Sequence, residues 1–176
     1  MIFLPTPLVG AYVIEMKRLE DERGFFARSF CREEFEGRGL NPDVAQCNVS
    51  FNPVRGTLRG MHFQASPHAE DKLVRCTRGA IWDVIVDLRP ESQGYRKWFG
   101  TELSAETRHA VYVPKGFAHG FQTLTGDAEV LYMMAKFYHP ESASGVRWDD
   151  PAFCIEWPIA NPSMSDRDRS FPQFAG

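Results

Sequence analysis

Two histidines lie in segments that alternate in the manner of β-strands, and both are candidates for chemistry. His62 occurs in the run LRGMHFQ (residues 58–64), and His119 occurs in PKGFAHGF (residues 114–121). Successive side chains of a strand point to opposite faces, so we predict that Arg59 faces away from His62. Two half-buried histidines on strands indicate a pocket inside a β-barrel. Such a pocket could hold a metal ion, or one histidine could transfer protons.

The residues around His62 argue against a catalytic metal. A mononuclear site in a β-barrel needs closely spaced histidines together with a carboxylate. Phe63 offers no lone pair, Gln64 follows it, and His68 falls in a predicted loop. One metal arrangement stays open, in which His62 and His119 combine with carboxylates. We predict that no metal is bound in the pocket.

Proton transfer is the second alternative. A histidine with a near-neutral pKa is a good general base once a carboxylate orients its ring. Tyr132 could supply an acid from the other side, and Lys72 could stabilise an oxyanion. Taken singly, His62 and Tyr132 also fit structural roles, and Asp168 fits a helix cap. The carboxylates available to orient His62 are Asp83, Asp87 and Asp168.

Strand signals dominate the chain and indicate how these residues are positioned. Short runs rich in β-branched and aromatic residues are bounded by turn residues, at 11–15, 72–76, 80–87, 110–113 and 129–133. This spacing predicts an all-β sandwich or barrel. A short helix is expected over 32–36, ended by Gly37 or Gly39. The tail is expected to form a Pro-rich loop over 157–162, followed by a capped turn over 165–169.

Length and composition limit the class of protein. The 176 residues, of which 43% are hydrophobic and 24% charged, predict a single domain over 1–176 with a sizeable core. We expect no membrane span, because no apolar run approaches about 20 residues, and no signal peptide. Four widely spaced cysteines predict a cytoplasmic protein with free thiols. A net charge of −3 without a basic run argues against nucleic-acid binding.

Six motifs, read in order, resemble one enzyme family. They are DERGFF (21–26), LRGMHFQ (58–64), KLVR (72–75), DVIVDLR (83–89), PKGFAHGF (114–121) and WDDP (148–151). Each motif is modest alone, but their order and spacing together are highly specific. The chain is similar, from about residue 6 to residue 168, to the dTDP-4-dehydrorhamnose 3,5-epimerase family.

The resemblance implies a cupin-type jelly roll with a few short helices, without a metal or an organic cofactor, assembled as a homodimer. It implies a nucleotide-linked 4-keto-6-deoxy hexose as substrate. It also implies that His62 is the base, that Tyr132 is the general acid and that Asp168 pairs with the histidine. The substrate-binding residues that it implies are Arg23, Gln46, Asn48, Arg59, Lys72, His119, Tyr138 and Arg167.

These residue types suit that chemistry. The C4 ketone acidifies the protons at C3 and C5, so a base on one face can form an enolate and an acid on the other face can invert the centre. Lys72 suits the enolate oxygen, and arginines suit a diphosphate because their planar fork meets two oxygens at once. Nothing in this scheme requires a metal or an organic cofactor.

Four positions depart from the family pattern. Arg28 stands where a glutamate usually contacts the nucleotide, and Cys47 replaces an aspartate. Met133 replaces a lysine, and Ala143 stands where a second glutamate is usual, although Glu141 is nearby. An arginine has no acceptor for a thymine N3–H, so the nucleotide could differ from the commonest one. Family drift with compensating neighbours is the competing interpretation.

The predicted function is therefore epimerisation of a nucleotide-diphospho-4-keto-6-deoxy hexose, first of all by a dTDP-sugar 3,5-epimerase. A single-centre (C3 or C5) epimerase, or one acting on a CDP- or GDP-linked sugar, is the alternative within this class. A non-catalytic sugar-nucleotide-binding cupin and a metal-dependent cupin are the alternatives outside it. The number of centres inverted depends on the shape of the pocket.

Overall fold

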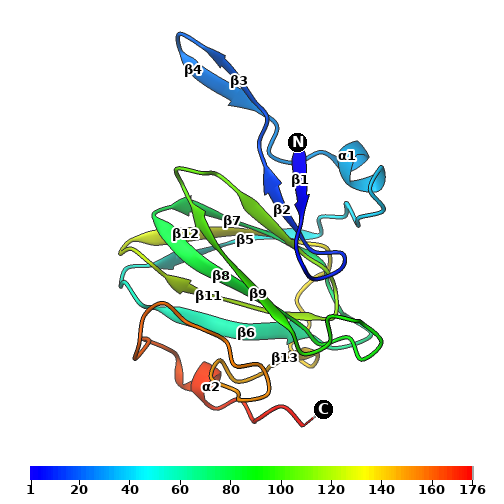
Figure 1. The fold of residues 1–176 in the computed structure, drawn as a ribbon, viewed down its shortest axis with the longest axis vertical. Coiled ribbons are helices and arrows are strands. Elements are labelled where there is room, and N and C mark those ends of the chain that lie inside the picture. Colours follow the sequence, from blue (N-terminus) through cyan, green and yellow to red (C-terminus); the bar gives the residue numbers. More distant parts are fainter. Residues whose placement is uncertain (176) are drawn as a thin grey trace.

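Two antiparallel β-sheets face each other in the computed structural model, which describes residues 1–175 (Figure 1). The strand order is β1-β2-β10-β7-β12-β5 in one sheet and β13-β6-β11-β8-β9 in the other. The six-stranded sheet consists of β1 (Ile2–Pro5), β2 (Tyr12–Glu15), β10 (Ala110–Val113), β7 (Lys72–Arg78), β12 (Ala128–Met134) and β5 (Gln46–Asn52). The five-stranded sheet consists of β13 (Ala143–Gly145), β6 (Leu58–Gln64), β11 (Phe117–Thr123), β8 (Ala80–Asp87) and β9 (Trp98–Ser104).

The main core fills the space between the sheets. Alternate residues point inward from each strand, so Val74 and Val111 of one sheet meet Ile85 and Phe121 of the other, all at most 1% exposed. Each such side chain contributes about 1.5–3 kcal/mol when it leaves water. This shared core holds the two sheets together.

The outer faces of the sheets are also covered. Val84 and Val86 point outward from β8 and pack under C-terminal residues that include Phe153 and Trp157. Burial of both faces explains why residues 80–87 are almost continuously apolar. On the other sheet, α1 (Arg32–Glu36) presses Phe35 onto the outer face. In Figure 1 the C-terminal chain, orange to red, runs alongside β6 and carries α2 (Asp166–Arg169).

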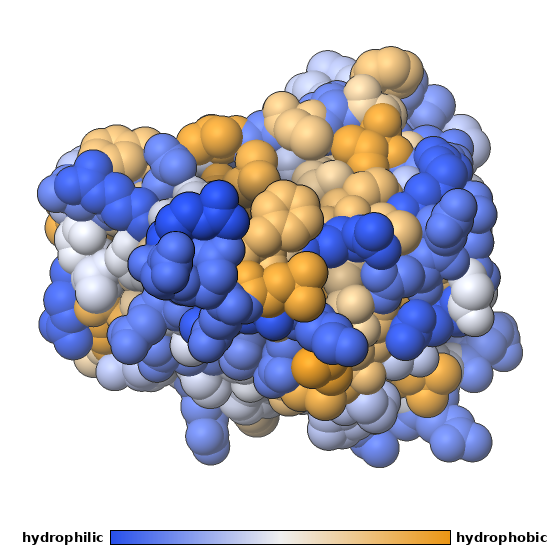
Figure 2. Space-filling model, turned by 90° about the horizontal axis from the view of Figure 1, so that it is seen from above, coloured by the Kyte–Doolittle hydropathy of each residue, from blue (hydrophilic) through white to orange (hydrophobic). Residues whose placement is uncertain are grey.

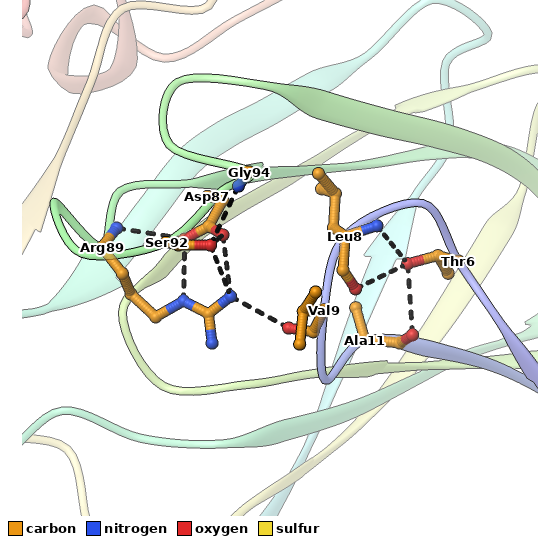
Figure 3. A network of polar contacts seen from close by, with 8 residues as sticks. All are labelled: Thr6, Leu8, Val9, Ala11, Asp87, Arg89, Ser92 and Gly94. Atoms are coloured by element: carbon orange, nitrogen blue, oxygen red, sulfur yellow. Dashed lines mark hydrogen bonds and ion pairs between the residues drawn. The ribbon is translucent and has the colours of Figure 1, made fainter.

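A buried carboxylate ties the β1–β2 turn to the loop after β8 (Figure 3). Asp87 is fully buried and accepts hydrogen bonds from Arg89 Nε (2.8 Å) and Nη2 (2.7 Å) and from Ser92 Oγ. The same Nη2 donates to the carbonyl of Val9 at 2.9 Å. These bonds hold the pKa of Asp87 below its ordinary value, although burial alone would raise it. Asp87 is therefore a structural residue and is not available to orient His62.

The predicted fold class is confirmed: the chain is a cupin-type jelly roll with two short helices among the described residues. The five predicted strands correspond to β2, β7, β8, β10 and β12, and the helix over 32–36 is confirmed as α1. The predicted capped turn is also present, since Ser165 Oγ accepts from the Asp168 amide at 3.1 Å. No helix among residues 1–175 is long and apolar enough to cross a membrane.

The clearest unpredicted element is a hairpin of β3 (Arg18–Asp21) and β4 (Gly24–Ala27). It projects from the body of the molecule at the top of Figure 1. Both strands are mostly exposed and have no apolar alternation, so the usual strand signal is missing. Strands β1, β5, β9 and β13 were also not predicted.

The prediction that Arg59 faces away from His62 is wrong, because both side chains line one cavity. The pairing of β6 with β11 changes register within residues 119–121, which interrupts strict alternation. Gly60 adopts φ 150° there, and a Cβ on it would lie 2.7 Å from the Cα of Gly120. The close approach of these two strands therefore requires glycine.

We predict that Gly60→Ala lowers the free energy of unfolding by about 1–3 kcal/mol through overpacking of the strand pair. Gly24→Ala is the matched control, because Gly24 also has a positive φ of 123° but has open space around its Cβ position. Urea denaturation of both variants measures the difference. Equal destabilisation by the two substitutions would contradict a steric role for Gly60.

Candidate active site

A cavity of about 300 Å³ opens between the two sheets and gathers most of the predicted site residues. Strands of both sheets contribute to its walls, and α2 contributes at its rim. Its lining includes Asn48, Arg59, His62, Lys72, His119, Tyr132, Tyr138 and Arg167.

His62 and Asp168 form a hydrogen-bonded pair at this cavity. His62 Nε2 lies 2.8 Å from Asp168 Oδ1, and Asp168 Oδ2 accepts from the Gly60 amide at 3.3 Å. Burial would raise the pKa of Asp168, but the hydrogen bonds from His62 and from the Gly60 amide hold that pKa below its ordinary value. An ionised carboxylate can only accept, so His62 Nε2 carries a proton and Nδ1 is left to accept one. The pair thus has the geometry of an oriented general base.

His119 has a carboxylate partner of its own. Its Nε2 lies 2.8 Å from Asp83 Oδ2, and both side chains are buried. Asp83 is therefore bonded to His119 and not to His62. Of the three carboxylates predicted to orient His62, the structure places Asp168 beside it. The second oxygen, Asp83 Oδ1, has no hydrogen-bond partner among the described residues. His62 and His119 are directly opposed on β6 and β11, yet each belongs to a different pair.

Lys72 lies on the six-stranded sheet and is almost completely buried. Its Nζ is 3.2 Å from Glu70 Oε1 and 3.4 Å from the carbonyl oxygen of His62. Burial lowers the pKa of Lys72, against the opposing effect of Glu70. Burial likewise raises the pKa of Glu70, and the lysine counteracts that shift. The ammonium group is thus positioned at the cavity by one carboxylate.

Tyr132 enters the cavity from β12, which belongs to the sheet opposite the one that carries His62. Its ring meets that of His119 edge to face, with centroids 6.0 Å apart. Burial raises the pKa of its hydroxyl well above the ordinary value, and the nearby Asp83 adds to the shift. The hydroxyl therefore stays protonated at neutral pH and can donate. His62 and Tyr132 therefore line one cavity from strands of different sheets.

Two predicted substrate-binding residues lie outside the cavity lining. Arg23 is at the tip of the β3–β4 hairpin, where its side chain is 85% exposed and paired with Asp21. Gln46 is the first residue of β5, and its Oε1 accepts from the backbone amide of Tyr138 at 3.0 Å. Gln46 thus holds the segment that bears an aromatic lining residue.

The four residues that depart from the family pattern lie in different parts of the structure. Cys47 and Met133 are paired on β5 and β12 and point away from the cavity, because their neighbours face inward. Arg28 is exposed and its Nη1 donates to Glu34 at 3.1 Å. Ala143 does line the cavity.

Some lining residues were not predicted as site residues. Glu70 is the most informative, since its place two residues before Lys72 on an extended segment puts both side chains on one face. Gln64 is buried and donates to Glu70 Oε2 at 3.1 Å. The others are Ser50, Phe63, Phe121, Met134 and Ser144.

Comparison with known proteins first gives the class of this jelly roll, which is that of a sugar epimerase. The family model described as dTDP-4-dehydrorhamnose 3,5-epimerase matches residues 5–176. This chain belongs to that family of isomerases, as the six sequence motifs indicate.

The individual relatives agree with this assignment. The dTDP-4-dehydrorhamnose 3,5-epimerase of Methanothermobacter thermautotrophicus is 44% identical over 96% of this chain and 92% of its own length. The crystal structure of the enzyme of that name from Elizabethkingia anophelis has a TM-score of 0.96 and 42% identity, covering 99% of this chain and 96% of its own. A 3'-monoepimerase from Streptomyces bikiniensis, in complex with dTDP-quinovose, has a TM-score of 0.88 and 36% identity, covering 96% and 86%.

We predict that Glu70→Gln lowers the free energy of unfolding by about 3 kcal/mol, because it leaves the buried Lys72 ammonium without its counterion. Glu36→Gln is the control, since Glu36 pairs with Arg32 where both side chains are more than half exposed, so its loss should change stability far less. Guanidinium denaturation at neutral pH measures both variants. A Glu70→Gln protein as stable as the Glu36→Gln protein would contradict this role for the buried pair.

Proposed function

We propose that this chain, as a single domain over residues 1–176, is a dTDP-4-dehydro-6-deoxy-D-glucose 3,5-epimerase that acts in the cytoplasm. The observation that carries the proposal is the His62–Asp168 pair facing Tyr132 across one cavity. The free state of all four cysteines among the described residues fits a reducing compartment. The substrate is a nucleotide-linked sugar whose C4 ketone acidifies the carbons on either side of it.

His62 is the general base of this scheme. Its Nδ1 removes the proton from the carbon next to the ketone, and the imidazolium that forms is stabilised by the Asp168 carboxylate. Asp168 is held by the Gly60 amide and by its place in α2, so it fixes the orientation of the ring. The electrons of the broken C–H bond move into an enolate on the ketone oxygen.

Lys72 stabilises that enolate oxygen. Its buried ammonium has Glu70 as its carboxylate partner and lines the cavity, so a developing negative charge finds a preorganised donor in a place shielded from water. His119 is a second donor on the same cavity, held by Asp83. No metal ion or organic cofactor enters this scheme.

Tyr132 returns the proton to the opposite face of the carbon. Base and acid lie on strands of different sheets, so a sugar ring between them meets one group on each face, and inversion follows. The raised pKa keeps the phenol protonated until the enolate accepts its proton. Reprotonation by His62 would only restore the starting configuration.

The nucleotide part of the substrate has its own set of residues in this proposal. Arg59 and Arg167 line the cavity and suit the diphosphate, because a guanidinium fork meets two phosphate oxygens at once. Tyr138 lines the same cavity with an exposed ring that suits stacking on the base. Asn48 offers an amide for the sugar or ribose. Arg28 is engaged with Glu34, so we expect it to leave the choice of base unchanged.

Inversion at a single centre is the second candidate. The observation that favours it is the likeness to a 3'-monoepimerase at 36% identity over 96% of this chain. Both reactions use the same base and acid, and they differ in whether the ring can turn to present C5 as well as C3.

We also propose that the enzyme is a homodimer in which Arg23 binds the substrate held by the partner. The β3–β4 hairpin stands away from its own cavity and exposes Leu19, Phe25 and Phe26, which are unusual on a solvated hairpin. Figure 2 looks down on the end of the molecule from which the hairpin projects and shows apolar surface among charged side chains. If a second copy of the chain covers this surface, Arg23 reaches the substrate cavity of that partner.

The first test is incubation with dTDP-4-keto-6-deoxyglucose in deuterated water, followed by NMR at C3 and C5. We predict deuterium at both positions with inversion of both centres, and equal turnover after treatment with a strong chelator. His62→Asn should reduce turnover by at least 10²-fold, since general base catalysis contributes about 10²–10⁴-fold. Deuterium at C3 alone would support the 3-epimerase, and a loss below about tenfold in His62→Asn would remove His62 from the role of base.

Tyr132→Phe should separate proton removal from inversion. We predict that this variant still exchanges substrate protons with deuterium through His62 but forms little inverted product, because the acid on the other face is missing. The ratio of exchange to product, measured by NMR, distinguishes this from loss of binding. Product formation at the wild-type rate would make Tyr132 a packing residue.

The dimer proposal predicts complementation between two inactive variants. Arg23→Ala and His62→Asn should each be impaired, whereas co-expressed chains should form mixed dimers with one complete site and regain activity. If Arg23 acted within its own chain, each site of the mixed dimer would lack one residue. A monomer by analytical ultracentrifugation, or no gain on mixing, would contradict the proposal.

A further inference from the structure

A cluster of metal-ligand side chains lies beside the cavity but outside the residues assigned to proton transfer. His68, His139 and Glu141 each offer one ligand atom, and these three atoms lie within 4.8 Å of one another. His139 Nδ1 is 3.1 Å from Glu141 Oε1, and His68 Nε2 is 4.0 Å from the same oxygen. The two imidazole rings are stacked, with centroids 3.5 Å apart and planes 14° from parallel. None of the three residues has a part in the proposed reaction.

The backbone beneath this cluster is fixed by one buried side chain. Gln64 Oε1 accepts from the amide of His139 at 2.7 Å, and Gln64 Nε2 donates to the carbonyl of His68 at 3.1 Å. The amide of Ala65 also donates to the carbonyl of Ser142 at 2.8 Å. The loop after β6 and the loop before β13 are therefore joined, and each presents its histidine from a preset position. Such preorganisation is what a binding site on two loops requires.

The donor set determines the class of ligand. Two imidazoles and a carboxylate form the set that Zn²⁺ takes in many proteins, at bond lengths of about 2.0–2.2 Å, with a further position open to water. The same carboxylate oxygen, Glu141 Oε1, already lies 3.1 Å from a nitrogen of His139 and 4.0 Å from a nitrogen of His68. Binding of an ion would require the partly exposed rings of His68 and His139 to turn about their side-chain bonds, and their ligand atoms start within 4.8 Å of one another. Hard cations such as Mg²⁺ prefer all-oxygen sites and fit this set poorly.

We propose that His68, His139 and Glu141 form a binding site for a divalent transition-metal ion of the Zn²⁺ type, separate from the catalytic pair. The site does not depend on the proposed reaction, because its ligands lie on loops outside it. It does border the cavity, since Tyr138 precedes His139 and lines the cavity wall. A bound ion would cross-link the two loops that Gln64 joins and restrict the segment that carries Tyr138. The ion would thus stabilise the folded chain without entering the chemistry.

Isothermal titration of metal-free full-length protein with ZnCl₂ tests the proposal. The background is Cys47→Ser with Cys154→Ser, because both thiols are exposed and could bind zinc themselves. We expect one equivalent of Zn²⁺ to bind and to raise the melting temperature. His68→Ala and His139→Ala should each weaken binding by at least about tenfold, the lower end of the effect of disturbing a metal's ligand sphere. Co²⁺ should give the visible absorption bands of a nitrogen-ligated site, and these bands should be lost in both variants.

His109→Ala is the matched control. His109 is also partly exposed and lies 3.6 Å from a carboxylate, Glu15, but among the described residues it belongs to no group of three metal-ligand side chains. Zinc affinity and cobalt bands should be unchanged in this variant, and circular dichroism verifies that every variant is folded. Absence of zinc binding in the parent protein, or full affinity in both His68→Ala and His139→Ala, would overturn the proposal. The proton-transfer scheme would be untouched by that result, because His62 and Tyr132 are not ligands.

Discussion

The cavity between the sheets depends on giving each buried carboxylate a hydrogen-bonding or ionic partner. A jelly roll of this size has an apolar core, and a single unpaired ion inside it would cost several kcal/mol. Three pairs satisfy this requirement: His62 with Asp168, His119 with Asp83, and Lys72 with Glu70. Each pair joins a carboxylate to a nitrogen-bearing side chain at the cavity. The polar cavity can therefore exist inside an otherwise apolar sandwich.

The side chains that line the cavity also come from both sheets. The five-stranded sheet supplies His62 and the C-terminal segment supplies its carboxylate partner, whereas the six-stranded sheet supplies Lys72 and Tyr132. Because the shared core holds the sheets together, the groups on opposite walls of the cavity keep their separation. The C-terminal segment packs on the outer face of β8, and it also carries Asp168, which contacts His62.

Much of this arrangement could be predicted from the sequence, and the failures have physical reasons. Periodicity identified the central strands, and the family resemblance selected His62, Tyr132 and Asp168 as candidates, of which the structure pairs His62 with Asp168 and places Tyr132 at the same cavity. Arg59 was misplaced because simple alternation cannot register the irregular pairing next to Gly60. The β3–β4 hairpin was missed because an exposed ribbon does not need an apolar face. Glu70 was missed because a glutamate in a charged stretch normally stays in solvent, and its burial depends on a lysine two residues away.

Strand alternation on β12 places adjacent residues under different constraints, because one faces the cavity and the next faces outward. Tyr132 faces the cavity, whereas its neighbour Met133 packs on the outer face beside α1 and is paired across the ladder with Cys47. Substitutions at the outward positions can accumulate over generations with little effect on turnover, which fits the departure of both residues from the family pattern. An engineer could use the same property: outward residues of β5 and β12 offer places to attach labels or adjust solubility while the reacting groups, one residue away, keep their positions.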